Sequence, residues 1–299
     1  MLLRKASPGL AAAVLASLFT AATAVAQETD AQACAGRLLD SPALLGGPLC
    51  LPAQPQRIVV LDPLFGLQMG VSLGLPIVGA TRVDLSGELP QGVADLGLFQ
   101  SPDIEALLSL APDLVIGDAA MHGAFLPQLS MIAPAVLPDT PDWREYYRVI
   151  AAAAGREAVA EAALAAFDAE LDALREILPQ GRSVSFLRLM PGGFQTYVDG
   201  PSAYAPVRLL SEAGLSRPAF ETVDDDTVMK RLTYEGLAAL EGEVLLYTAG
   251  PGDTAALEAE VTAHPLWRAL PQVRAGRVHR VEAAHWLGFG GVESARAVL

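Results

Sequence analysis

The sequence predicts an α/β protein made of two lobes that are joined by one long helix. Three observations lead to this fold class. Between residues 57 and 137, short apolar runs alternate with helical spacing, which is typical of mostly parallel strands with helical crossovers. Helix-forming residues then dominate from 142 to 178. From 183 to the end of the chain, short strands and helices alternate again.

The first 26 residues predict an export signal. Arg4 and Lys5 form a positive start, residues 11–22 form an apolar centre, and Ala24-Val25-Ala26 supplies a small-residue cleavage site. The apolar run is too short for a convincing membrane span. Because a lipid anchor needs a cysteine directly after the cleavage point and the first cysteine is Cys34, we expect a soluble periplasmic protein that is cleaved near Ala26.

Removal of the signal leaves 273 residues with 18 basic and 34 acidic side chains, a formal charge of −16. This length suits one large domain or two lobes of ordinary size. Such a charge repels nucleic acid and anionic lipid, so an anionic ligand would be held by local arginines. The cations are almost all arginines, which suit two-pronged recognition of carboxylate or hydroxamate oxygens, although the scarcity of lysine also fits a GC-rich genome.

Residues 27–56 predict an N-terminal arm that carries the chain's two cysteines, Cys34 and Cys50. In an exported chain these two are expected to form a disulfide. The loop closed has about 15 residues, and the bond would stabilise the arm by roughly 3 kcal/mol in the chain-entropy model. A metal site is a weaker interpretation because no histidine lies near either cysteine.

Residues 57–141 predict the N-terminal lobe. Arg57–Asp62 and Ile77–Ala80 have the composition of strands and flank a helical pattern over Leu64–Leu73, which makes a βαβ unit. Pro102 fits the first position of a helix, where its missing N–H costs nothing. The further expected elements are a strand at Ala94–Gly97, a helix opened by Ser101–Glu105, a strand at Asp113–Gly117, a helix over Phe125–Met131 and a strand at Ala135–Leu137.

Residues 142–180 predict two linking helices, Asp142–Ala153 and Glu157–Leu178, interrupted at Gly155. The second has about 22 residues and therefore a length of about 33 Å. Its apolar residues recur every three or four positions and form one stripe: Leu164, Phe167, Leu171, Leu174 and Leu178. A single long helix between two α/β halves is expected to act as a stiff strut.

Residues 181–299 predict the C-terminal lobe. Its expected strands are Ser183–Leu189, Gln195–Val198, Val244–Tyr247 and Arg277–Val281, and its expected helices are Tyr204–Ala213, Thr233–Leu240, Thr254–Val261, Pro265–Leu270 and a final amphipathic helix. Within it, Pro265–Gly291 predicts a short helix, a proline stop, a turn, a strand and an aromatic and glycine loop. Nothing in that segment looks catalytic, and it resembles the far wall of a pocket with His285 and Trp286 at the lip.

Three segments carry a resemblance to a known family: Ser101–Ile116 (SPDIEALLSLAPDLVI), the strut after Gly155, and Pro265–Gly291. Together they resemble the periplasmic substrate-binding proteins of iron-siderophore, haem and cobalamin ABC importers, and Pro265–Arg280 resembles most the ferric-hydroxamate branch. The resemblance extends from Arg57 to the C-terminus. It implies the two-lobed fold of class III periplasmic binding proteins, with its helical backbone. It also implies a monomer without cofactor or enzymatic activity that captures a ferric siderophore and delivers it to an inner-membrane ABC permease.

Two exposed glutamates are implied as permease contacts by their positions in that family, Glu105 in the first lobe and Glu235 in the second. Two carboxylates far apart can steer and orient a partner without being buried. The alternative is that each is a first-turn glutamate favoured by the dipole of its own helix.

The ligand is expected where strand ends of the two lobes face each other. The candidate ligand-binding residues are Arg82, Met121, His122, Arg188, Tyr197, Tyr204, His285 and Trp286. Arginines would pair with anionic oxygens of the chelate, and aromatic rings would pack on its apolar faces. The alternatives are a structural ion pair for Arg188, helix-start packing for Tyr204, and satisfied loop histidines for His122 and His285. No residue is expected to bind a metal ion directly.

One segment departs from the hydroxamate branch. Where that branch has an aromatic residue, Thr222–Thr227 is acidic, so the ligand could differ from a hydroxamate. The run Asp224–Asp226 could meet a cationic or hydroxyl-rich ligand, but a solvated loop is the favoured explanation of these aspartates. Haem or cobalamin stays open, because His122, His285 or Tyr204 could serve as an axial ligand to haem iron. An exported hydrolase would need a nucleophile elbow or a histidine-rich metal motif, and the sequence has neither. A sensor or surface receptor built on the same fold also stays open.

Overall fold

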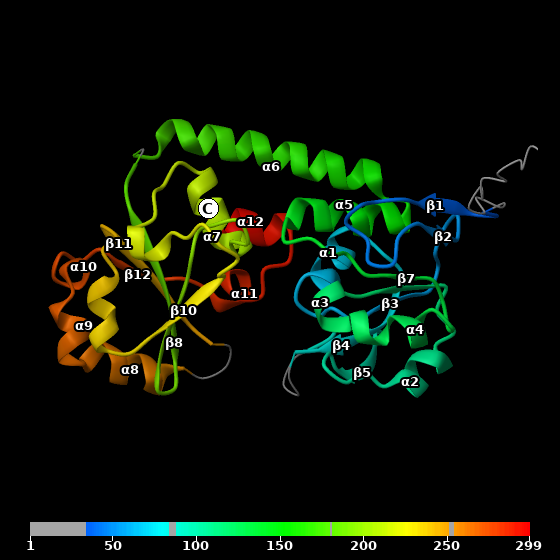
Figure 1. Cartoon of the computed structure of the whole chain (residues 1–299), viewed down its shortest axis with the longest axis horizontal. Coiled ribbons are helices and arrows are strands. Elements are labelled where there is room, and N and C mark those ends of the chain that lie inside the picture. Colours follow the sequence, from blue (N-terminus) through cyan, green and yellow to red (C-terminus); the bar gives the residue numbers. More distant parts are fainter. Residues whose placement is uncertain (1–33, 84–87, 180, 251–253) are drawn as a thin grey trace, which may run out of the picture. The chain divides into compact units, whose positions relative to one another are not determined.

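The computed structural model of the chain describes residues 34–83, 88–179, 181–250 and 254–299. It contains two five-stranded sheets (Figure 1). The predicted export signal lies outside the described residues. The first sheet is parallel throughout, with strand order β5-β4-β3-β6-β7. Its strands are β3 (Ile58–Val60), β4 (Ile77–Arg82), β5 (Ala94–Leu98), β6 (Leu114–Ile116) and β7 (Ala135–Val136). The predicted parallel lobe is therefore confirmed.

Short helices connect these strands, as the βαβ pattern predicts. They are α1 (Gly66–Ser72), α2 (Ile104–Ser109), α3 (Ala119–His122), the 3₁₀ turn η1 (Gly123–Phe125) and α4 (Leu126–Leu129). Successive residues of a strand point to opposite faces of its sheet. Accordingly Ile58 and Val60 enter one hydrophobic cluster, whereas Val59 and Leu61 enter another. Both faces of the central strand are thus buried, which explains its unbroken apolar run.

The second sheet is mixed, with strand order β10-β9-β8-β11-β12. Strand β8 (Val184–Met190) pairs in parallel with β11 (Val244–Ala249) and antiparallel with β9 (Gly193–Tyr197), while β12 (Val278–Arg280) and β10 (Met229–Leu232) form the edges. The remaining elements of this lobe are α7 (Ala205–Glu212), η2 (Ala219–Glu221), η3 (Glu235–Ala239), α8 (Ala255–Ala263), α9 (Pro265–Ala269), α10 (Pro271–Arg274), α11 (Ala283–Trp286) and α12 (Val292–Val298). The expected pair of α/β lobes is confirmed.

Two helices link the lobes, α5 (Trp143–Ala154) and α6 (Glu157–Ile177), and Figure 1 shows α6 beside α5 and α7. Asp142 caps α5 through the N–H of Arg144. Gly155 ends it with φ of 70°, a left-handed conformation that glycine adopts without strain. Phe167 of α6 belongs to a cluster that also contains Ile58 of β3 and Phe186 of β8, so one continuous core joins both sheets to α6.

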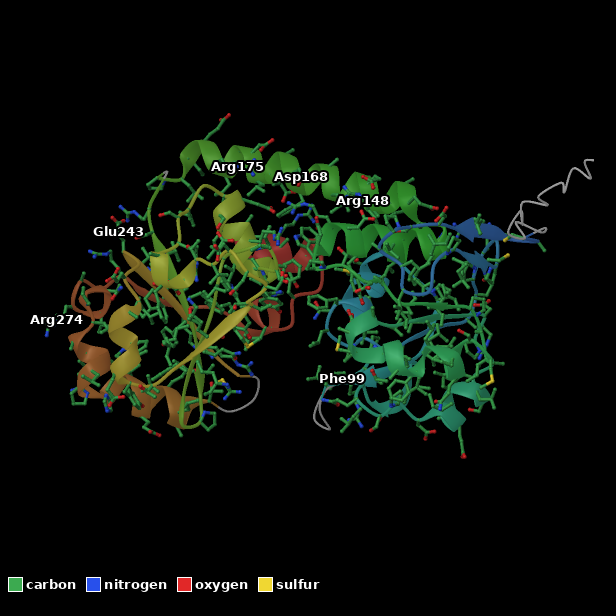
Figure 2. All side chains as sticks on the ribbon, in the orientation of Figure 1. Phe99, Arg148, Asp168, Arg175, Glu243 and Arg274 are labelled. Carbon is green, nitrogen blue, oxygen red and sulfur yellow. The ribbon has the colours of Figure 1, made fainter. Side chains whose placement is uncertain are left out.

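Polar residues of α6 form ion pairs with α5, as expected for an amphipathic helix. Arg148 of α5 pairs with Glu161 at 2.8 Å, and Asp168 pairs with Arg144 at 3.2 Å. Figure 2 labels Arg148, Asp168 and Arg175 along these two helices. Each of these ion pairs near the surface contributes only about 0–1 kcal/mol to the stability of the fold. The buried apolar stripe therefore holds α6 in place.

The N-terminal arm forms an antiparallel pair of strands, β1 (Arg37–Leu39) and β2 (Leu49–Leu51). Cys34 and Cys50 are disulfide-bonded, which confirms the predicted bridge. The side chain of Arg37 donates to the carbonyls of Ala152 and Ala153 at 2.7 and 2.9 Å. The arm is therefore fastened to the last turn of α5, where backbone carbonyls lack partners within the helix.

Several local predictions were wrong. The helix expected over Thr233–Leu240 is only the 3₁₀ turn η3. The predicted proline stop is confirmed, since α9 ends at Ala269, but Pro271 then begins helix α10 where a turn was expected. His285 and Trp286 lie on helix α11, in what was predicted to be a loop. The edge strand β10 had no sequence signal, because it is held by pairing with β9 and its own pattern is half exposed.

Candidate functional site

The turn after β3 is organised by the buried carboxylate of Asp62. It accepts hydrogen bonds from the N–H groups of Leu64 (2.9 Å), Phe65 (3.2 Å) and Gly66 (2.7 Å), and from the hydroxyl of Tyr146 (2.8 Å). These donors replace the water that a buried charge would otherwise need. Burial, together with the charge of Asp62, raises the pKa of Tyr146 well above its ordinary value. The first turn of α1, including Phe65, is therefore rigidly placed.

A row of aromatic side chains runs from this turn into the second sheet. Consecutive ring centroids are 4.6 to 6.4 Å apart, within the usual range for aromatic contacts. We call it the aromatic row; in order its members are Tyr146, Phe65, Tyr204, Tyr197, Phe186 and Trp286. Phe65 comes from the first lobe and Tyr204 from the second, so the row connects the two lobes.

Tyr204 holds a central place in this row. It is the N-cap residue of α7, and its hydroxyl donates to the carbonyl of Leu287 at 2.9 Å. Its ring stacks on that of Tyr197 at 5.2 Å. Burial raises the pKa of Tyr204, so its phenol stays neutral at any physiological pH. Tyr204 can therefore offer a ligand its half-buried ring face more readily than a phenolate oxygen.

Arg188 lies near the carboxyl end of β8, opposite Thr248 of β11 and Gln195 of β9. By strand alternation it projects from the same sheet face as Phe186 of the aromatic row. The residue is half-buried, its Nε is buried without a hydrogen-bond partner, and it joins none of the ion pairs among the described residues. A Cβ added to Gly250 would lie 4.0 Å from its Nη2, so the guanidinium reaches the end of β11. The structural ion pair considered for Arg188 is therefore absent in the described part of the chain.

Helix α11 brings His285 and Trp286 to the same end of the second sheet. His285 is half-buried, and its Nδ1 is buried without a partner among the described residues. Trp286 is only 2% exposed and packs on Phe186, with 4.6 Å between ring centroids. Trp286 thus lies beneath the surface, in contrast to the position at a pocket lip that the sequence suggested.

In the first lobe, Arg82 and one ring nitrogen of His122 have partners of their own, whereas Nε2 of His122 is buried without a hydrogen-bond partner among the described residues. Arg82 at the end of β4 forms an ion pair with Asp95 at 2.7 Å. Half-buried Met121 and fully buried His122 lie on α3, and Nδ1 of His122 accepts the N–H of Asp118 at 3.1 Å. Burial lowers the pKa of His122, so its imidazole is neutral. Burial, with a contribution from Asp62, raises the pKa of Asp118 to about 6.

The structure therefore connects part of the predicted set. Tyr197, Tyr204 and Trp286 belong to the aromatic row, with Arg188 on the same sheet face. Arg82 at the end of β4 and His122 on α3 instead make contacts within the first lobe. Sequence reasoning missed Phe65. A signal for it existed, because an acidic residue followed by Pro-Leu-Phe directly after a buried strand predicts a capped turn at a sheet's carboxyl edge.

The two predicted permease contacts are both exposed. Glu105 lies in the first turn of α2, after Asp103, whose side chain caps the helix at the N–H of Ala106 (2.9 Å). Glu235 begins η3. Hydrogen bonds from its own backbone and from the side chain of Thr233 lower the pKa of its carboxyl group. Neither glutamate has an ion-pair partner in the described part of the chain, so both carboxylates are accessible to a cationic partner.

Two surface cavities lie apart from the aromatic row. One of about 260 Å³ borders the tip of the β8–β9 hairpin, and the other, of about 360 Å³, lies between the N-terminal arm and the end of α5. No described helix is long and apolar enough to cross a membrane.

Comparisons with known proteins agree with this architecture. A family model described as periplasmic binding protein matches residues 72–284. The chain is 27% identical over 269 residues to the probable siderophore-binding lipoprotein YfiY of Bacillus subtilis, covering 83% of this chain and 82% of YfiY. It is 26% identical over 264 residues to the Fe(3+)-citrate-binding protein YfmC of the same organism, covering 83% and 80%.

Among solved structures, SirA of Staphylococcus aureus complexed with staphyloferrin B has a similar fold. The TM-score is 0.74 at 22% sequence identity, and the match covers 88% of this chain and 96% of that one. The family model, which spans more than half of the chain, and the shared two-lobed fold lead to one conclusion: this chain belongs to the periplasmic binding protein family.

Proposed function

We propose that this protein captures an anionic ferric chelate beside Arg188 and the aromatic row and delivers it to the membrane permease of an ABC importer. The observation that carries the proposal is the guanidinium of Arg188, whose buried Nε has no hydrogen-bond partner and which joins no ion pair among the described residues. A partly buried charge without a partner is unfavourable, and a ligand that supplies oxygen acceptors removes that penalty. A guanidinium presents donors in a planar fork that matches a carboxylate or a hydroxamate.

The aromatic row supports the same proposal from the apolar side. Phe65 and Tyr204 are half-buried and come from different lobes, with ring centroids 6.4 Å apart. Rings placed in this way can pack on the carbon skeleton of a chelator while Arg188 holds its anionic oxygens. His285, whose Nδ1 has no hydrogen-bond partner among the described residues, is a candidate for an additional hydrogen bond to the ligand.

The other residues predicted to bind the ligand remain part of the proposal, but in two different roles. Arg82 and Met121 are partly exposed and could meet the ligand from the first lobe, whereas His122 and Trp286 are buried and would act by supporting their neighbours. Iron would be held through the chelator, and the ligand is cargo that the protein binds without catalysis.

Export and delivery complete the proposed function. Residues 1–26 would direct the chain to the periplasm and be removed near Ala26, which N-terminal mass spectrometry of the secreted protein would check. Glu105 and Glu235 would then contact arginines of the permease, since both are exposed and lack ion-pair partners in the described part of the chain. Relatives whose names describe siderophore or ferric citrate binding support this assignment.

Fluorescence titration of the purified protein tests the ligand class directly. The panel consists of ferric citrate, a ferric hydroxamate, a ferric catecholate, haem and cobalamin, with iron-free chelators as controls. We expect saturable binding of at least one anionic ferric chelate. Binding of haem alone, with an absorption change that is lost in His285→Ala, would support a haem-binding protein instead. Absence of binding to every ferric chelate would contradict the proposal.

A further inference from the structure

Gln68 of α1 holds the glycine-rich segment that follows Trp286. Its Nε2 donates to the carbonyl of Gly288 at 2.9 Å. Its Oε1 lies 3.4 Å from the hydroxyl of Ser294, which itself accepts the N–H of Gly290 at 2.9 Å. Hydrogen bonds thus connect the N–H of Gly290 through Ser294 and Gln68 to the carbonyl of Gly288, two residues earlier in the same segment.

The glycines of this segment are required by the close approach of α1. A Cβ on Gly290 would lie 2.2 Å from Oε1 of Gln68 and 2.3 Å from its Cβ, so any side chain there would displace Gln68. Gly291 has φ of 89° and faces Met69, whose Cγ would be 3.0 Å from an added Cβ. The backbone of the segment is therefore packed directly on the helix.

The same segment is held from the other side by the second lobe. The hydroxyl of Tyr204 donates to the carbonyl of Leu287 at 2.9 Å, one residue before the carbonyl that Gln68 binds. Phe65 precedes Gln68 by three positions, so both lie on one side of the first turns of α1, and Phe65 contacts Tyr204. Gln68 and Phe65 together connect the first lobe to Tyr204 and to the segment that directly follows His285 and Trp286.

We infer that Gln68 is a positioning residue that fixes the Leu287–Gly291 segment, and with it His285 and Tyr204, in the conformation that binds the ligand. The inference rests on the proposed function for its ligand-binding part only. Gln68 is exposed, so water can replace its hydrogen bonds and the segment can open locally without unfolding the lobes. A population of opened molecules lowers the apparent affinity in proportion to the competent fraction.

Hydrogen exchange of the ligand-free protein tests the positioning role without any assumption about the ligand. Gln68→Ala removes both the packing and the hydrogen bonds, and Gln68→Met retains an unbranched side chain of similar size but no amide. Both variants should speed exchange at Gly290 roughly three- to tenfold, as expected for loss of one ordinary hydrogen bond. Exchange in β3 and β8 should stay unchanged. Gln128→Ala on α4 is the matched control, since Gln128 is exposed and its amide has no hydrogen bond among the described residues.

Binding of ferric citrate and of a ferric hydroxamate supplies the second readout. Affinity in both Gln68 variants should fall by a similar factor, with the dissociation rate increased and the control unaffected. Unchanged exchange at Gly290 in both variants would overturn the inference, and so would an equal increase in every segment, which would mean that Gln68 only stabilises the whole fold. If the wild-type protein bound no ferric chelate, the proposed function would fail while the exchange result would still decide the role of Gln68.

Discussion

Replacing Arg188 with glutamine should weaken ligand binding without destabilising the protein. The Nε of Arg188 has no hydrogen-bond partner and the residue joins no ion pair among the described residues. Its removal therefore breaks no internal hydrogen bond or ion pair there, and it relieves the unfavourable burial of a lone charge. The thermal midpoint of the ligand-free variant should equal or exceed that of the wild type.

The loss of affinity follows from the bonds that Arg188 would make to the ligand. A hydrogen bond to a charged group contributes about 1.5–3 kcal/mol, which corresponds to a factor of roughly 10 to 150 in the dissociation constant. Arg188→Lys retains the charge but loses the planar fork, so its affinity should lie between those of the wild type and the glutamine variant. Binding by the wild type should also weaken as salt concentration rises.

Titration calorimetry of each chelate that the wild type binds, together with thermal unfolding, provides the assay. Arg182→Gln is the matched control: Arg182 precedes the same strand, is exposed, and pairs with Glu243 at 3.4 Å. Two results would refute the reasoning. One is wild-type affinity in Arg188→Gln for every chelate, and the other is a loss of ligand-free stability comparable to the loss in binding energy, which would reveal a structural arginine.

Three further predictions concern other parts of the molecule. The double variant Glu105→Ala and Glu235→Ala should bind the chelate as the wild type does but abolish uptake of radioactive iron by cells, because both carboxylates are exposed; impaired chelate binding would argue against separate surfaces for ligand and permease. Replacing Cys34 and Cys50 with serine should lower the free energy of unfolding by about 3 kcal/mol in urea titrations, with ligand affinity unchanged. The pKa of Asp118 is raised by burial to about 6, so the folded state retains a proton that the unfolded state has already lost, and this group's contribution to stability falls as pH rises from about 4 to about 6. Asp118→Asn, which can still cap α3, should therefore flatten that pH dependence in urea titrations at pH 4.5 and 7; an unaltered slope would contradict it.

Local chemistry allowed most of the elements to be predicted. Asp142 marks the start of α5 in the sequence because its side chain caps the helix. Gly155 marks the end of α5 because glycine adopts the left-handed conformation there. Strand β3 was recognisable because both of its faces are buried, which leaves an unbroken apolar run. Strand β10 was missed because its conformation depends on a neighbour that is distant in sequence, and a half-exposed pattern does not distinguish a strand from a loop.

The candidate site was predicted only in part. Arg188, Tyr204 and His285 were identified because side chains at strand ends meet at one edge of an α/β sheet. Their partners were not predictable, since whether an arginine has a counter-ion depends on which carboxylates the fold brings near it. Arg82 has Asp95 and Arg188 has no such partner in the described structure, although nothing in the sequence distinguishes the two arginines.

The sequence by itself determined the two α/β lobes and the long helix between them, because strand and helix patterns recur within a few residues. It also determined the disulfide of the arm, because an exported chain with two cysteines offers one pairing. Only the tertiary structure decided that Trp286 is buried as the last ring of the aromatic row and that Gln68 donates a hydrogen bond to the carbonyl of Gly288. Gln68 and Gly288 are more than two hundred positions apart in the sequence, and Trp286 packs on Phe186, which is also distant from it. Such contacts depend on how the whole chain packs.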